Sequence, residues 1–429
     1  MRKLLIISYH ALPADIIASY RSNAYLRFLK NLNYEPTLLT HFLGMEERNE
    51  VCIEQNDYGK VIRIPIRSSR LGKITSYLET KKLLNKISIF VRWMMGFLDS
   101  NPDAINSYFS LKSHCISELD LKQYDLVLGI FSPHHHLRLC YNLHKRFGIS
   151  YVLDFRDLWH NRIMAKHYSP TSLEKVNDTF SSLYWKKWLS KALFFTITSE
   201  PWKKRLSELT QTQGYVIMNG YESAKISASA TYDDQFVILH AGSLYEHQQI
   251  EIFLEGARKF IQDYQVNDIK IKFIGGDRTG GLSGNKYGFM IEPVRRVRNF
   301  LEKSHCDITH RIDKSDILLE MSKSHLLLFF GHSKVSGWYS GKIFDYLAAR
   351  RNILVVPNDN DVVEELIVNT QSGQIADTPE EVYNYLKSAY FEWRESGSLT
   401  YCGVEKELVK YSRESQISIL GHLMNQYLD

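Results

Sequence analysis

The sequence predicts an α/β protein with two doubly wound, Rossmann-like domains that face a cleft. Short apolar runs alternate with helix-spaced stretches along nearly the whole chain, which is typical of parallel sheets with helices on both faces. A polar segment of small residues, 219–234, interrupts this alternation. A length of 429 residues also exceeds what one hydrophobic core usually serves, so two domains are expected.

The first half of the chain contains seven apolar runs that we expect to be strands. They are residues 3–9, 35–40, 60–65, 125–130, 150–155, 193–198 and 215–218. Stretches with helix-spaced apolar residues lie between them, at 20–32, 101–120, 134–147 and 201–209.

The same alternation resumes after residue 234. Further strands are expected at 236–240, 269–275, 307–312, 325–330 and 352–357, and helices at 249–263, 292–303, 314–323, 342–349 and 362–369. We therefore predict an N-terminal Rossmann-like domain at 1–220 and a second Rossmann-like domain at 221–403. A closing helix at 404–429 is expected to pack back on the first domain.

Composition and charge exclude several classes of protein. The five cysteines are scattered and form no C-x-x-C pair, which favours reduced thiols in a cytoplasmic protein. No run approaches the roughly 20 apolar residues that span a bilayer. The net charge of +5 permits anionic partners, but neither zinc-finger spacing nor a long basic tract indicates nucleic-acid binding.

Residues 73–98 interleave five basic residues with large apolar ones. A basic amphipathic helix of this kind can lie on the anionic inner face of a membrane. The alternative is a helix that packs its apolar stripe on the sheet and leaves its lysines in water. Peripheral membrane contact and simple core packing therefore both remain open for this segment.

Doubly wound domains bind ligands at the carboxyl ends of their strands, where loops meet helix N-termini. In the second half, Gly242 and Ser243 follow one expected strand, and Gly275 ends the next. Arg278 lies in the glycine-rich loop after Gly275 and supplies a mobile cation. Glycine lets the backbone approach a ligand closely, and free N–H groups suit a phosphate.

A third loop ends in Ser340 and Gly341, directly before the expected helix at 342–349. Lys342 then lies at the positive end of a helix dipole, where a lysine without an anion is unfavourable. A bound diphosphate would remove this conflict. Asp345, one turn later, would accept hydrogen bonds from ribose hydroxyls.

Three histidines, His134 to His136, follow Pro133 at a strand end. Adjacent histidines at a helix start cannot all face one metal ion, so we expect no metal site. One possibility is that one of these histidines faces the cleft, as a catalytic group (His134) or as an acceptor-side contact (His135). The alternative is that the turn is merely solvated.

Asp154, Arg156 and Asp157 lie where an expected strand becomes a loop. Alternation places Asp154 and Arg156 on one side and Asp157 on the other. A plain interpretation is an Arg156–Asp154 brace of the loop. We favour Asp157 as the side chain that faces the cleft, because a later loop position reaches a substrate more freely.

Several short motifs, taken in order, resemble glycosyltransferases of the GT-B fold, family 4-like, of bacterial polysaccharide and glycoconjugate biosynthesis. The resemblance covers nearly the whole chain. The motifs are SPHHHL at 132–137, LDFRDLWHNR at 153–162, TITSEPWKKRL at 196–206, NG at 219–220, GSLY at 242–245, IGG at 274–276 and KIFDYLA at 342–348.

The sequence departs from this family at three places. Gly337 and Asp345 stand where many members carry two glutamates, so the first carboxylate is absent and the second is shortened. The basic pair that usually follows the GSLY loop is missing. Ala18 and Ser19 replace the paired glycines of the first loop.

The resemblance implies an enzyme that moves a hexosyl group from a nucleotide sugar to a glycan, lipid-linked or other glycoconjugate acceptor. It also implies that the domain at 1–220 binds the acceptor and that the domain at 221–403 binds the nucleotide sugar. It also implies retention of configuration, with neither a metal nor a cofactor. The residues expected to act in catalysis are Asp157, His134 and Lys342, and those on the acceptor side are Arg156, His135, Ser19 and Arg21. A sugar-nucleotide epimerase and a non-catalytic nucleotide-sugar-binding subunit are the alternatives.

Overall fold

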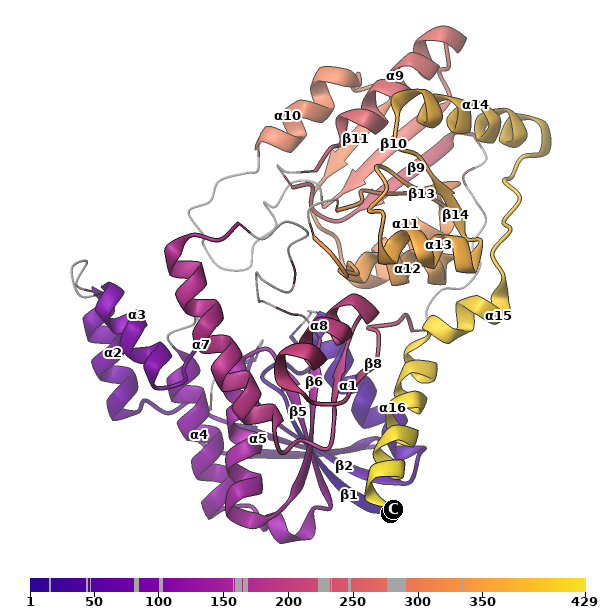
Figure 1. Ribbon diagram of the computed structural model, residues 1–429. Coiled ribbons are helices and arrows are strands. Elements are labelled where there is room, and N and C mark those ends of the chain that lie inside the picture. The colour runs from indigo at the N-terminus through magenta and orange to yellow at the C-terminus, as the bar shows by residue number, and fades with distance from the viewer. Residues whose placement is uncertain are drawn as a thin grey trace. The chain divides into compact units, whose positions relative to one another are not determined.

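The computed structural model describes the chain apart from residues 15–16, 44, 47, 81–84, 100–102, 157, 159–163, 165–168, 223–231, 233, 246–247, 276–290 and 333–334, and apart from the side chains of 17 and 291–293. Its contacts divide it into two compact units (Figure 1). The first unit is Met1–Asn219 with Glu414–Asp429, and the second is Gly220–Arg413.

The first unit is built on an eight-stranded sheet in the order β3-β4-β2-β1-β5-β6-β7-β8. All neighbouring strands are parallel except β3 and β4, which form an antiparallel hairpin. The strands are β1 Arg2–Ile7, β2 Tyr34–His41, β3 Cys52–Asn56, β4 Gly59–Ile64, β5 Leu126–Phe131, β6 Ser150–Phe155, β7 Phe195–Ile197 and β8 Gly214–Val216.

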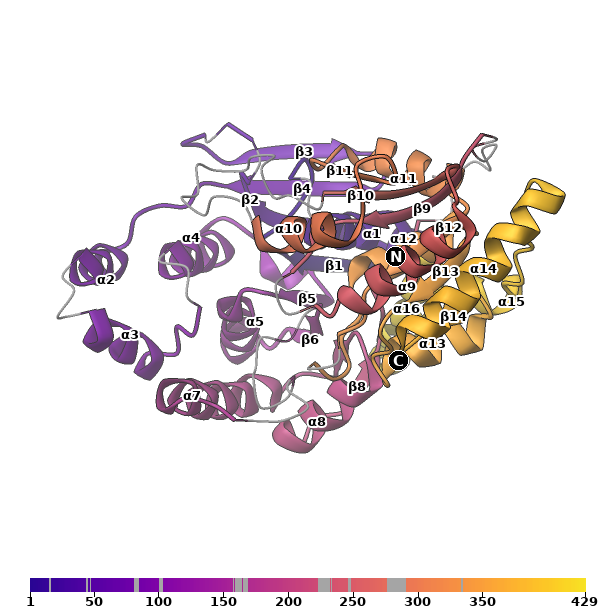
Figure 2. The ribbon, with the colours of Figure 1, turned by 90° about the horizontal axis from the view of Figure 1, so that it is seen from above.

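Helices cover both faces of this sheet, because its central strands are apolar on both sides. Buried residues of α1 and α16 share one core with inward-facing residues of β1, β2 and β5. The helices α4, α5 and α7 lie on the other face (Figure 2). The helices of this unit are α1 Ile17–Lys30, α2 Arg70–Thr80, α3 Asn85–Met94, α4 Asp103–Ser117, α5 His134–Phe147, α7 Ser172–Leu189, α8 Glu200–Thr210 and α16 Arg413–Leu428.

The closing segment divides between the two units. Leu420 and Met424 of α16 are buried in the core of the first unit. Residues 404–412, which the sequence analysis assigned to the returning helix, belong instead to the second unit. There the Val404 N–H donates to the Thr370 carbonyl at 2.9 Å, and the short helix α15 Glu405–Leu408 follows.

The second unit has a six-stranded parallel sheet in the order β11-β10-β9-β12-β13-β14. Helices α9, α10 and α14 pack on one face, where residues of α9 and α14 share a core with β9 and β10. The elements are β9 Phe236–Ala241, α9 Glu251–Tyr264, β10 Ile269–Ile274, α10 Ile291–Phe300, β11 Cys306–Thr309, α11 Lys314–Lys323, β12 Leu326–Phe329, α12 Gly341–Ala349, β13 Asn352–Val355, α13 Val362–Thr370, β14 Gly373–Ile375 and α14 Pro379–Ser396.

The segment 73–98 does not form the single helix that its pattern indicates. It contains most of α2 and all of α3, and residues 81–84 lie outside the described part of the chain. Arg92, one of the five basic residues of this segment, is buried and forms an ion pair at 3.0 Å with Glu79. A polar contact therefore joins the two helices inside the segment.

Candidate functional site

The strand order of the second unit defines where a ligand should bind. From β9 the chain proceeds outward to β10 and β11, and then returns to the other side of β9 with β12. The crevice at such a reversal, beyond the carboxyl ends of the strands, is the usual ligand site of an open α/β sheet. The loops after β9 and β12 and the start of α12 are therefore the candidate site.

Gly242 follows β9 with φ at 111°, a region that favours glycine. A Cβ atom here would lie 2.9 Å from Nζ of Lys342, so any side chain would displace that ammonium group. Gly275, at the end of β10, is also close: a Cβ there would lie 3.4 Å from the Gly242 Cα. The two glycines predicted from the sequence therefore lie close together, with Gly242 beside Lys342, and Ser243 follows directly after Gly242.

The start of α12 presents unused hydrogen-bond donors. Ser340 is the N-cap residue, but its side chain makes no capping hydrogen bond. Its carbonyl accepts the Ile343 N–H at 3.1 Å. The N–H groups of Gly341 and Lys342 have no acceptor among the described residues. Two donors at this helix end are therefore available to an anion, and the anion site expected from the sequence stays a prediction.

Lys342 is held against His240, the penultimate residue of β9. Its Nζ lies 3.4 Å from His240 Nε2, while His240 Nδ1 lies 3.0 Å from the Leu328 carbonyl oxygen. The carbonyl can only accept, so Nδ1 carries the proton and Nε2 accepts from the ammonium group. Burial lowers the pKa of Lys342 to about 8.

Tyr346 fixes the same region from one turn further along α12. Its hydroxyl accepts the Ala241 N–H at 2.8 Å and donates to the Leu328 carbonyl at 3.2 Å. Lys342 and Tyr346 lie four residues apart on one helix face. They contact His240 and Ala241, the last two residues of β9. His240 and Tyr346 were not predicted. Two features of the sequence indicate them: His240 lies at the end of a strand next to the expected site, and Tyr346 lies one helical turn after Lys342.

Asp345 is half-buried and forms an ion pair with Lys314 at the start of α11. No other hydrogen bond reaches its carboxylate from the described residues. The proposed ribose contact therefore has to share this carboxylate with Lys314. The role of Asp345 in donor binding remains a prediction.

Gly337, the position of the missing carboxylate, adopts φ at 73°, which disfavours a longer side chain. Its N–H donates to Asp361 Oδ2 at 2.6 Å. A carboxylate is therefore present beside this backbone, but it comes from the N-cap residue of α13. The sequence pattern did not indicate that Asp361 places a carboxylate beside Gly337.

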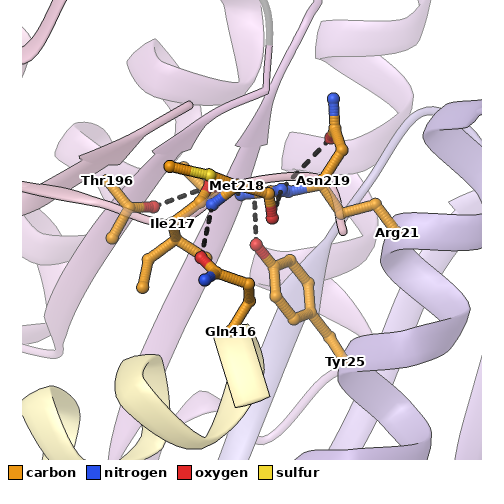
Figure 3. A network of polar contacts seen from close by, with 8 residues as sticks. Arg21, Tyr25, Thr196, Ile217, Met218, Asn219 and Gln416 are labelled. Atoms are coloured by element: carbon orange, nitrogen blue, oxygen red, sulfur yellow. Dashed lines mark hydrogen bonds and ion pairs between the residues drawn. The ribbon is translucent and has the colours of Figure 1, made fainter. Parts of the chain in front are cut away.

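Arg21, expected on the acceptor side, lies inside the first unit (Figure 3). Its Nε and one terminal nitrogen donate to both oxygens of Asp154, at 2.9 and 2.7 Å. The three remaining N–H bonds go to the Ile217 and Met218 carbonyls and to Asn219 Oδ1. All five donors of the guanidinium group are used, so none remains for a sugar.

Asp154 is fully buried and its carboxylate accepts from three side chains. Besides Arg21, Thr196 donates at 2.6 Å and Tyr25 at 2.8 Å. The brace of this loop is therefore Arg21–Asp154, and the interpretation of an Arg156–Asp154 pair is wrong. The network joins α1, β6 and β7 to the last residues before the second unit.

The two predicted histidines also face inward. His134 Nδ1 accepts from the Trp185 indole at 3.1 Å, and the two rings stack. Both ring nitrogens of His135 lie near partners, 3.3 Å from Asp99 Oδ2 and 2.9 Å from Ser107 Oγ. These contacts give both rings structural roles, and they lend no support to a catalytic or acceptor-side role.

His135 belongs to a buried cluster that the sequence analysis did not identify. The ring of Tyr9, just after β1, contacts the rings of His10, His41, His135 and His136. Burial lowers the pKa of both His10 and His41 to about 4, so these imidazoles are neutral at pH 7. The cluster occupies the point where the strand order of the first sheet reverses, between β1 and β5.

Four further predicted site residues remain, of which two are described and two are not. Ser19 is fully buried in α1, and its hydroxyl has no partner among the described residues. Arg156 follows β6, near enough to His10 to lower its pKa. Asp157 and Arg278 lie outside the described residues, so their predicted roles stay untested.

Comparisons with known proteins gave matches only at the level of structure. No family model and no curated protein matches the sequence. The chain superposes on sucrose-phosphate synthase of Thermosynechococcus elongatus with a TM-score of 0.64 and 12% identity, over 99% of both chains. A glycosyltransferase of Rickettsia africae (TM-score 0.59, 12% identity, 100% and 99% covered) is similar. So is Anabaena HepE in complex with UDP and glucose (TM-score 0.59, 10% identity, 99% and 100% covered).

These similarities, at 12% identity or less, establish the fold of the chain. The protein has the GT-B fold, with two Rossmann-like units, and the predicted fold class is confirmed. Among the described helices, none combines the length and the apolar character that crossing a bilayer requires.

Proposed function

We propose that this protein is a glycosyltransferase that moves a sugar from a nucleotide-sugar donor to a glycan, lipid-linked or other glycoconjugate acceptor. The observation that carries the proposal is the start of α12. Two backbone N–H groups without acceptors, the helix dipole and Lys342 converge there, at the topological switch point of the second sheet. Donors and positive charge that converge in this way favour binding of a diphosphate.

The chemistry follows from this electrostatic arrangement. When the bond from the sugar to the diphosphate breaks, negative charge develops on the leaving diphosphate. The Lys342 ammonium group and the α12 N–H groups are positioned to neutralise that charge without a metal. Retention of configuration, and the nucleotide sugar as a substrate in place of any separate cofactor, are part of the proposal.

HepE of Anabaena, which shares the fold, was solved with UDP and glucose. Uridine-diphosphate sugars are therefore the first donors to test. A panel of nucleotide sugars should contain one that raises the melting temperature, because a ligand that binds only the folded state stabilises it. That donor should then yield transferred sugar with an acceptor present. Binding without any turnover would favour the non-catalytic alternative, and no binding by any donor would contradict the proposal.

Asp345→Ala should weaken binding of that donor by about 1.5–3 kcal/mol, because the ribose hydroxyls lose an ionised acceptor. Isothermal titration calorimetry measures this change directly. Lys314→Met is the matched control, since it breaks the same ion pair but keeps the carboxylate. It should leave the affinity within a factor of a few. If both variants lose affinity equally, Asp345 acts through the ion pair and the ribose assignment is wrong.

We also propose that the first unit touches an anionic membrane through α2 and α3. The apolar side chains Ile87, Phe90, Val91 and Met94 recur at helical spacing on α3, and all are exposed. Lys86, on the same helix, is exposed as well. Basic and apolar side chains together fit a surface of anionic lipid.

Phe90→Gln/Met94→Gln should therefore reduce partitioning onto vesicles that contain phosphatidylglycerol, on the order of 10-fold for each side chain. Vesicle flotation measures the bound fraction. Val368→Gln/Ile419→Gln replaces two apolar residues exposed elsewhere and serves as the control. Equal partitioning of all three proteins, or no partitioning of the unaltered protein, would exclude membrane contact through α3.

A further inference from the structure

A cavity of about 490 Å³ lies in the first unit, where β4 ends and α2 begins. Its wall is completed by residues of α4. Ile64 and Pro65, at the carboxyl end of β4, line this cavity, and α/β sheets bind ligands at the carboxyl ends of their strands. None of the predicted site residues lies there.

Two cations line this cavity. Arg67 and Arg70 are both exposed, and neither guanidinium group has an ion pair or hydrogen bond with a described residue. A smaller cavity of about 360 Å³ adjoins it along α2, shares Ser68 with it, and is lined by Lys73. Basic side chains therefore gather around the first turn of α2, which contains no acidic residue.

The same turn of α2 has N–H groups to offer. The Ser69 hydroxyl accepts the Gly72 N–H at 2.9 Å and donates to Asn106 Oδ1 at 2.9 Å, which ties the turn to α4. The N–H groups of Arg70 and Leu71 find no acceptor in the described part of the chain. These N–H groups form the positive end of the helix dipole.

A buried histidine on α4 adds an independent observation. His114 lines the cavity and is 6% exposed, and its Nε2 makes no hydrogen bond with a described residue. Its Nδ1 lies 2.8 Å from Oε2 of Glu118, the one acidic residue among those that line the cavity. That carboxylate is thus next to the imidazole, while both arginines are left without a counter-charge.

We propose that this cavity binds the phosphoryl group of a phosphorylated acceptor. Guanidinium groups pair with phosphate through two hydrogen bonds, and helix amides supply further donors. The volume exceeds that of a phosphate, so the remainder of the molecule has room against Leu71 and Phe109, which also line the cavity. Naming the molecule an acceptor rests on the proposed glycosyl transfer, whereas the phosphate site itself does not.

The test compares a soluble and a lipid-borne phosphate monoester on the full chain, with no nucleotide sugar present. Calorimetry measures binding of sn-glycerol 3-phosphate, with glycerol as the reference, and flotation measures binding to vesicles that contain phosphatidic acid. Arg67→Gln/Arg70→Gln should weaken binding on the order of 30-fold, because two charge-assisted contacts are lost. Lys122→Gln/Lys145→Gln removes the same charge from exposed positions elsewhere in the unit and should change it less than twofold.

Each outcome decides the question. Binding of both probes that is lost only in the Arg67→Gln/Arg70→Gln variant supports the site. Binding of the vesicles alone that is lost in this way supports the site and assigns the phosphate to a lipid. Selective loss for glycerol phosphate alone supports it with a water-borne acceptor. Equal loss in the control variant, or no binding of either probe, overturns the proposal. Phosphate binding by a protein that binds no nucleotide sugar in the donor panel would contradict the proposed function and leave the phosphate site standing.

Discussion

Lys342→Met should lower donor turnover on the order of 100-fold, because the ammonium group that meets the charge of the departing diphosphate is lost. The folded protein without donor should become more stable. Burial depresses the pKa of Lys342 from its ordinary value to about 8, so the charged form is penalised in the folded state. That penalty is complete below pH 8 and is relieved as the pH rises toward 10.5.

Steady-state kinetics and thermal melts on this one variant test both statements. In the unaltered protein, kcat/KM should also fall as the pH rises through about 8, because the ammonium group loses its proton. Lys342→Met should lack this decline. Lys270→Met is the control, since Lys270 lies on the same unit but pairs with Asp307. A Lys342 variant that is destabilised yet fully active would retire the diphosphate role.

Arg21→Met should destabilise the first unit by about 3–5 kcal/mol, because it leaves the carboxylate of Asp154 buried without its cation. Two main-chain carbonyls before the second unit also lose their donor. Urea unfolding followed by circular dichroism measures the loss. The magnitude is large because both partners of the pair are almost completely shielded from water.

Two controls separate this effect from a general sensitivity to charge. Lys203→Met removes the cation of a pair with Glu200, whose side chain is 66% exposed, and should cost no more than about 0.5 kcal/mol. Arg21→Met/Asp154→Leu removes both buried charges and should be less unstable than the sum of the single changes. Strict additivity would mean that the two residues contribute separately, against the network of Figure 3.

The alternation of strands and helices could be predicted because each central strand is buried on both faces and reads as an apolar run. The expected range 150–155 is β6, and 314–323 is α11. The antiparallel strand β3 was missed, because it is a half-exposed edge strand without such a run. Helix α14 was also missed, although Thr378 and Glu381 form a capping box that marks its start.

Part of the candidate site could be predicted in the same way. Gly242, Ser340 and Lys342 were identified because a glycine after a strand and a lysine at a helix start are local features of the sequence. The errors concerned side chains whose partners are distant. His134, His135 and Arg21 were placed at the surface of the cleft, but their polar atoms bond inside the unit.

The sequence by itself determined the two doubly wound sheets, because hydrophobic periodicity and helix-start chemistry act within a few residues. Only the tertiary structure decided which polar groups meet. Arg21 reaches Asp154 133 positions away, and Lys342 reaches His240 102 positions away. Alternation tells which face of a strand a side chain occupies, but a pairing also depends on how each helix crosses the sheet. That crossing is set by packing between segments far apart in the chain.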